Sequence, residues 1–194
     1  MTLSSDDLLP IVHRFYPKGM NEYDPGYKET EEHRRLIQAR VQASAGDSPW
    51  TSLLDRLNAR FPGAIMNGSV HLPTGGWDAG YIGRLVLPTR GAHEKHHELS
   101  LLISFLAPCY VIYSASIVIA PTTRSSGRTQ EVRFAFTPDE EPYVRAVSEE
   151  ISSIFPGYEP LPPEVGNVVV PDVVAGNQAM GKTTLFHCLF TDAW

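Results

Sequence analysis

The stretch His93-Glu94-Lys95-His96-His97 contains the residue types that zinc-dependent hydrolysis requires. It matches H-E-x-x-H, in which two histidines one helical turn apart bind zinc and the glutamate activates water. The surroundings do not suit a buried catalytic helix, because both variable positions are basic and Glu98 follows directly. We interpret the stretch as the polar start of a helix. The alternative hypothesis is a zinc hydrolase with His93 and His97 as metal ligands and Glu94 as the base.

A second pattern, from Gly176 to Thr183, matches the phosphate-binding sequence G-x-x-x-x-G-K-[ST]. Only eleven residues follow Thr183, too few for the helix and the further parallel strands of a nucleotide-binding fold. Pro171 also interrupts the apolar run that would have to be the preceding central strand. We therefore interpret the segment as a glycine-bounded loop, and we expect no nucleotide, metal or other cofactor.

Composition indicates one soluble domain. The 194 residues are 42% hydrophobic and 20% charged, which is enough apolar material for a core. No apolar run approaches the 18 residues of a membrane span, and the first residues lack the pattern of a signal peptide. Cys109 and Cys188 lie in apolar runs, so we expect buried thiols in a reducing compartment. These features predict a cytoplasmic protein.

Charge is distributed unevenly along the chain. The formal net charge is −6, and residues 130–194 alone contain ten acidic and three basic side chains. Such a surface either only aids solubility or attracts a basic partner. Nucleic-acid binding is not expected, because it requires clustered Lys and Arg side chains against phosphate.

The first 63 residues are predicted to be helical. A short helix capped by Ser4 or Ser5 is followed by a helix over residues 29–45, whose acids precede its arginines. Asp47 or Ser48 caps the next helix, with Pro49 in the favoured first position.

Residues 64–194 are predicted to contribute a sheet and two helices. Strands are expected over residues 64–72, 81–87, 110–120 and 131–136, a helix over 89–106, and strands or buried segments over 168–174 and 183–190. The fold class is α+β: a single domain, 1–194, with a mixed or antiparallel sheet of roughly five or six strands packed by helices.

The other predicted helix follows Thr137, where Thr137, Pro138 and Glu140 match a capping box with proline at the first helical position. Its apolar stripe leaves out Glu140, Glu141 and Glu149. We expect these glutamates to be exposed, and they are our candidate partner-binding residues.

The last third of the chain resembles small bacterial immunity proteins of polymorphic-toxin systems. The resemblance rests on residues 162–173 (PPEVGNVVVPDV) and 184–194 (TLFHCLFTDAW), with 137–142 (TPDEEP) before them. It implies a cytosolic, acidic, non-enzymatic α+β protein that neutralises a toxin by covering or distorting its active site.

The leading hypothesis is therefore a protein-binding module, an immunity protein with a basic toxin domain as partner. Besides the zinc hydrolase, a third hypothesis is a small-ligand-binding domain. In that hypothesis, the aromatic and glycine-rich segment around Trp77 would line a pocket.

Overall fold

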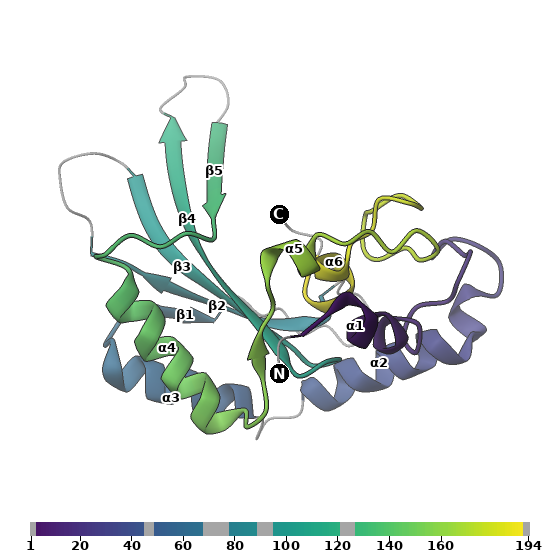
Figure 1. Ribbon diagram of the computed structural model, residues 1–194, viewed down its shortest axis with the longest axis horizontal. Helices are drawn as coiled ribbons and strands as arrows, with labels where there is room; N and C mark the ends of the chain where they lie inside the picture. The colour runs from purple at the N-terminus through teal and green to yellow at the C-terminus, as the bar shows by residue number, and fades with distance from the viewer. Residues whose placement is uncertain (1–2, 45–48, 68–77, 89–94, 121–126, 192–194) are drawn as a thin grey trace.

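The computed structural model describes residues 3–44, 49–67, 78–88, 95–120 and 127–191. A single sheet runs through the molecule, with helices on both of its faces (Figure 1). This arrangement confirms the predicted single-domain α+β class and its helical N-terminal third. No helix in the described ranges combines the length and the apolar character needed to cross a membrane.

Two of the N-terminal helices begin at residues that the sequence predicts, and the helix expected from residue 29 begins two residues later. Ser4 caps α1 (Ser5–Val12): its hydroxyl accepts from the Asp7 N–H, and the Asp7 carboxylate accepts from the Ser4 N–H (3.1 Å). Thr30 follows the short 3-10 helix η1 (Tyr27–Glu29) and caps α2 (Glu31–Ala43). The last of these helices, α3 (Pro49–Arg60), has Pro49 at its start. The expected caps Asp47 and Ser48 lie outside the described residues.

The sheet is antiparallel apart from one short parallel strand. Its strands follow the order β1 (Ile65–Asn67), β2 (Gly80–Val86), β3 (Lys95–Ser104), β4 (Cys109–Ala120) and β5 (Gly127–Arg133). A two-residue strand, β6 (Glu159–Pro160), pairs in parallel with the beginning of β4. The predicted sheet of five or six strands is therefore present.

The prediction of a helix over residues 89–106 is wrong, because most of the described part of this segment, Lys95–Ser104, is β3. Leu101 lies opposite Gly83 of β2 on one side and Ile112 of β4 on the other. β3 is thus a central strand. Leu102 packs in the core on one face of the sheet and Leu101 in the core on the other, and a strand covered on both faces is apolar at nearly every position. A continuous apolar run does not distinguish a buried strand from a buried helix. Here the pairing with β2 and β4 makes the segment a strand and not a helix.

The C-terminal part contains α4 (Glu141–Ile154), α5 (Pro163–Gly166) and α6 (Leu185–Leu189). Residues 183–190 are predicted to form a strand or a buried segment. They are mostly buried, but they form α6 over most of their length and not a strand. Residues 168–174 are likewise not a strand: only an isolated bridge joins Val169 to Thr184, and Val170, Val173 and Val174 are buried.

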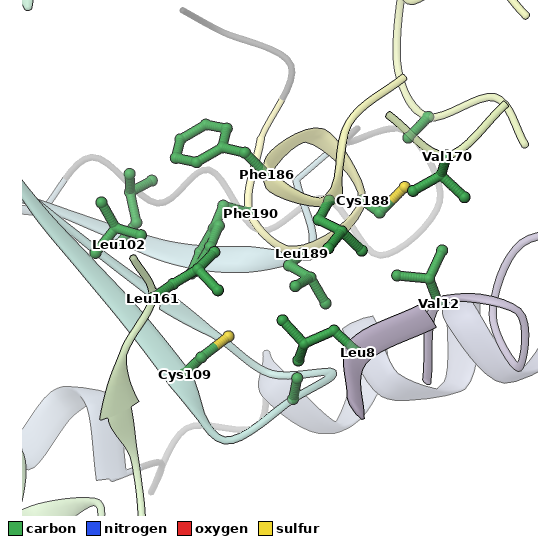
Figure 2. Packing of buried hydrophobic residues seen from close by; sticks show 14 of the residues in the cluster. Leu8, Val12, Leu102, Cys109, Leu161, Val170, Phe186, Cys188, Leu189 and Phe190 are labelled. Atoms are coloured by element: carbon green, nitrogen blue, oxygen red, sulfur yellow. The ribbon is translucent and has the colours of Figure 1, made fainter. Parts of the chain in front are cut away.

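The two sheet faces carry separate apolar cores. Helices α3 and α4 cover one face, where the Trp50 ring stacks on Tyr81 at 5.2 Å between ring centroids. Helices α1, α2 and α6 cover the other face at one end of the sheet. Figure 2 shows Leu8 and Val12 of α1 pointing toward Leu189 and Cys188 of α6. These packed layers leave one end of the sheet, beside the start of α4, with polar side chains.

Candidate functional site

The zinc pattern is not placed on a helix. His93 and Glu94 lie outside the described residues, whereas His97 lies in β3, which begins at Lys95. The helix that would put His93 and His97 on one face is therefore absent over the second half of the pattern. No group of three His, Cys, Asp or Glu side chains in the described ranges is arranged to hold a metal.

His97 instead forms a cross-strand pair with Ser116 of β4. The two residues are direct partners in the sheet register, and the His97 Nδ1 lies 3.0 Å from the Ser116 Oγ. A serine beside a histidine is also the arrangement of an activated nucleophile. However, Ser116 is paired with His97 on one side and Glu131 on the other, so its peptide groups belong to the sheet ladder and not to an oxyanion hole. The pair therefore fits a structural contact at the polar end of the sheet.

The segment with the phosphate-loop pattern does not have phosphate-loop geometry. The residues before it are irregular, and Asp172 there accepts hydrogen bonds from His13 Nε2 (3.1 Å) and Lys18 Nζ (3.4 Å). The helix that follows, α6, is only five residues long and is capped by its own Thr184 and His187. Lys182 is exposed. The segment thus lacks both the strand and the open helix N-terminus that cradle a phosphate.

Glu140 is buried, with 5% of its surface exposed, so the expectation that it is exposed is wrong. Its Oε1 accepts from Ser114 Oγ (2.6 Å) and Arg133 Nη2 (2.7 Å). Its Oε2 accepts from the backbone N–H of Thr137 (2.8 Å) and from Thr137 Oγ1 (3.0 Å). Four donors from β4, β5 and the turn before α4 therefore saturate this carboxylate. Glu140 holds the site together and is not available to a partner.

The predicted capping box is formed only in part. The Glu140 carboxylate reaches back to the Thr137 N–H, as predicted. The Thr137 hydroxyl donates to the same carboxylate and caps no helical N–H, and α4 begins at Glu141. This turn draws the Glu140 side chain under the helix and onto the sheet, which explains its burial.

Glu141 and Glu149, the other two candidates, are both exposed as expected. Glu149 forms an ion pair with α3: its Oε2 lies 3.1 Å from Arg60 Nη1. The same arginine nitrogen lies 3.5 Å from Oε1 of the neighbouring Glu150. Arg56 of α3 also lies 3.4 Å from Glu150. The acids at the C-terminal end of α4 are thus balanced within the molecule.

A pocket of about 300 Å³ opens beside Glu140. It lies between the end of β2, the start of β3, the end of β5 and the first turn of α4. Its lining combines apolar, aromatic and charged side chains: Leu87, Pro88, His97, Arg133, Thr137, Asp139, Glu140 and Tyr143.

Backbone and ring contacts fix the walls of this pocket. The Leu87 N–H donates to the His97 carbonyl (2.9 Å), which holds the apolar wall beside the imidazole. The Tyr143 ring lies at 5.5 Å from the Phe61 ring, between ring centroids. Arg133 donates from Nη1 to the Ala135 carbonyl (2.9 Å) while its Nη2 binds Glu140. The pocket is therefore preformed.

The electrostatics of the pocket follow from these bonds. Burial raises the pKa of Glu140, but the hydrogen bonds from Ser114, Thr137 and Arg133 outweigh burial and hold its pKa below the ordinary value. Glu140 is therefore charged at neutral pH and compensates Arg133. Asp139, which lines the pocket, and the adjacent Glu141 are exposed and negative. Among the described lining residues, the exposed charge, that of Asp139, is therefore negative, whereas the buried Glu140 and its partner Arg133 are neutral as a pair.

Sequence reasoning did not identify Ser114, Arg133, Asp139 or Tyr143 as members of a site. The capping box was a usable signal, since a glutamate that bonds back to Thr137 is drawn away from solvent. No local pattern indicates that Arg133 and Ser114 face Glu140, because that contact depends on the register of β4 with β5, in which Ser114 lies opposite Arg133. Trp77, proposed to line a ligand pocket, lies outside the described residues.

Comparison with known proteins assigns no family: no protein-family model, no curated protein and no solved structure matches the chain.

Proposed function

We propose that the protein is a non-enzymatic protein-binding module that uses the acidic start of α4 to bind a basic partner. The observation that carries the proposal is the position of exposed acids beside the pocket at the start of α4. At the C-terminal end, Glu149 and Glu150 are paired with arginines of α3. At the start, Asp139 and Glu141 are exposed beside an open pocket.

This distribution favours a binding role because exposed acids beside a pocket attract a basic partner. Glu131 of β5 is exposed as well, and its register partner Ser116 lies next to His97. Three exposed acids thus belong to the elements that surround the pocket. We name Glu131, Asp139 and Glu141 the acidic rim.

The particular class that we propose is a cytoplasmic immunity protein that neutralises a bacterial toxin. Its support is the resemblance of residues 137–142, 162–173 and 184–194 to such proteins, together with the acidity of the last third of the chain. A toxin that acts on nucleic acid has a basic active-site surface, and an acidic rim complements such a surface. The proposed partner is therefore a basic toxin domain encoded beside this gene.

Binding kinetics with the purified product of the neighbouring gene test the proposal. The double variant Asp139→Lys/Glu141→Lys should lower the association rate roughly tenfold at low salt, because rim charges act mainly on encounter. It should also flatten the dependence of the rate on ionic strength.

The matched control is Asp55→Lys/Glu164→Lys, which changes the net charge equally at exposed positions on α3 and α5. It should change the rate much less. Equal effects of the two double variants would show that only net charge matters, and absence of any binding would refute the proposed partner.

A further inference from the structure

We propose that β5 receives an extended, basic segment of the protein partner as an additional strand on its outer edge. This inference rests on the proposed function and specifies how the partner makes main-chain contact beside the acidic rim. β5 is the last strand in the order of the sheet, and its only partner strand in the described ranges is β4. Figure 1 shows the β4–β5 hairpin reaching beyond the helices at one end of the sheet. An edge of this kind can pair with another chain.

The hydrogen bonds across the sheet decide which main-chain groups of β5 face outward. The Leu87 N–H donates to the His97 carbonyl (2.9 Å), so the main-chain groups of His97 face β2. In an antiparallel sheet, the groups of one residue face one neighbouring strand and those of the next residue face the other. Ser116, the register partner of His97, therefore directs its groups to β5, and Glu131, the partner of Ser116, directs its groups to β4.

The outer edge of β5 consequently presents the main-chain groups of the residues between, Arg128, Gln130 and Val132. A contact at β6 agrees with this assignment, because the Leu161 N–H donates to the Tyr110 carbonyl (2.8 Å) on the side of β4 that β5 shares. The N–H and the carbonyl of Val132 have no partner among the described residues. An added strand can therefore bond to these groups without displacing any bond between β5 and β4.

The side chains at this edge select a basic segment. Glu131 is exposed and forms no ion pair with the part of the chain that the structure describes. In an added antiparallel strand, the residue opposite Glu131 lies on the same face with its Cβ about 4.5–5.5 Å away. A lysine or an arginine there pairs with the carboxylate. The adjacent residue of the segment lies opposite Val132, which packs partly buried against the core, so a β-branched side chain fits that position.

A second copy of the chain fits this edge less well. Each copy has a formal net charge of −6, so like charges oppose the approach of two copies. The basic side chain nearest to Glu131 on its own strand face is that of Arg133, which already donates to the Glu140 carboxylate and to the Ala135 carbonyl. Arg133 therefore does not supply the cation that Glu131 of another copy would need. The charges favour a basic partner over self-association.

Residue-resolved amide exchange with short peptides tests this inference without the natural partner. The probe is acetyl-TTVKVTT-amide, and its acidic counterpart is acetyl-TTVEVTT-amide. The lysine peptide should bind saturably and slow the exchange of the Gln130 and Val132 amides, whereas the Glu131 amide, which already faces β4, should change little. N-methylation of both valines of the peptide should abolish binding, because their N–H groups face β5 when the lysine lies opposite Glu131. N-methylation of the lysine should leave binding intact.

The charge requirement is tested with two variants of the protein. The glutamate peptide should bind at least about threefold more weakly than the lysine peptide, since like charges directly opposite each other are destabilising. Glu131→Gln should remove this preference. Glu149→Gln, at an exposed position on α4, should keep it.

Absence of saturable binding of the lysine peptide up to its solubility limit would overturn the inference, and so would equal binding of the peptide methylated at its valines. Equal or tighter binding of the glutamate peptide would overturn the assignment to a basic partner. Protection of the Val132 amide that grows with the concentration of the protein alone would show that a second copy occupies the edge. None of these results refutes the proposed function, which fails only if the neighbouring gene's product does not bind or binds without regard to the acidic rim.

Discussion

Replacement of Glu140 by glutamine tests the role of the saturated carboxylate. The change keeps the shape of the side chain but removes its charge and turns one acceptor oxygen into an NH₂ donor. In both orientations of the glutamine amide, the new NH₂ group faces other donors. At the position of Oε1 these donors are Arg133 and Ser114, and at the position of Oε2 the donor is the Thr137 N–H. The Ser114 hydroxyl can rotate to accept, but the guanidinium and the peptide N–H cannot. One charge-assisted bond is therefore lost in any orientation.

The cost follows from the environment of that bond. A hydrogen bond to a charged group contributes about 1.5–3 kcal/mol, and loss of one partner leaves the other desolvated. Arg133 is 33% exposed, so water partly compensates it, and we expect a loss of about 2 kcal/mol in the free energy of unfolding. For a chain of this size, that corresponds to a fall of about 4–8 °C in Tm.

The pH dependence has a definite sign. The pKa of Glu140 is lowered in the folded protein from its ordinary value of 4.5. Its contribution to stability is thus fully present above about pH 4.5 and is lost as the pH falls through the lower, folded pKa. The difference in unfolding free energy between the wild type and Glu140→Gln should be constant near neutral pH and should shrink below pH 4.5.

Urea unfolding followed by circular dichroism, from pH 7 downward, measures this difference. The control is Glu149→Gln, which removes an exposed pair with Arg60 and should cost less than about 0.5 kcal/mol. Equal losses for the two variants at pH 7, or a difference that grows in acid, would show that the carboxylate of Glu140 does not hold the site together.

Three further outcomes check other parts of the structure. Burial raises the pKa of both thiols, that of Cys109 to about 12, so Ellman's reagent should label Cys109 and Cys188 only after unfolding; rapid labelling of the native protein would contradict their burial. A Cβ on Gly83 would lie 2.9 Å from the Trp50 ring, so Gly83→Ala should cost about 1–3 kcal/mol in a thermal melt, and an unchanged Tm would show that the ring yields freely. Elemental analysis should find no stoichiometric zinc; one zinc per chain that is lost on His97→Ala would restore the hydrolase hypothesis.

Much of the fold follows from local signals in the sequence. Ser4 and Pro49 mark helix starts because capping and fixed backbone angles act within a few residues. The strand over residues 110–120 is evident from its β-branched and aromatic residues, and β4 begins only one residue earlier. These predictions succeed since nothing distant in the chain opposes the local preference.

The failures share one physical cause, which is that long-range contacts override local patterns. The apolar residues of β3 are compatible with a helix until β2 and β4 provide partners on both sides. Glu140 lies outside the apolar stripe of α4, yet it is buried because Ser114 and Arg133 approach from the sheet. Helical periodicity alone cannot identify a glutamate that is satisfied by another element.

The most direct test of the proposed binding surface is hydrogen–deuterium exchange of the protein alone and in complex with the neighbouring gene's product. Binding through the acidic rim predicts slower exchange in the complex over residues 131–145, which include the end of β5 and the first turn of α4. Exchange in α2, on another part of the molecule, should stay unchanged (Figure 1). Protection confined to α2 or to residues 171–182, with none over 131–145, would contradict the account.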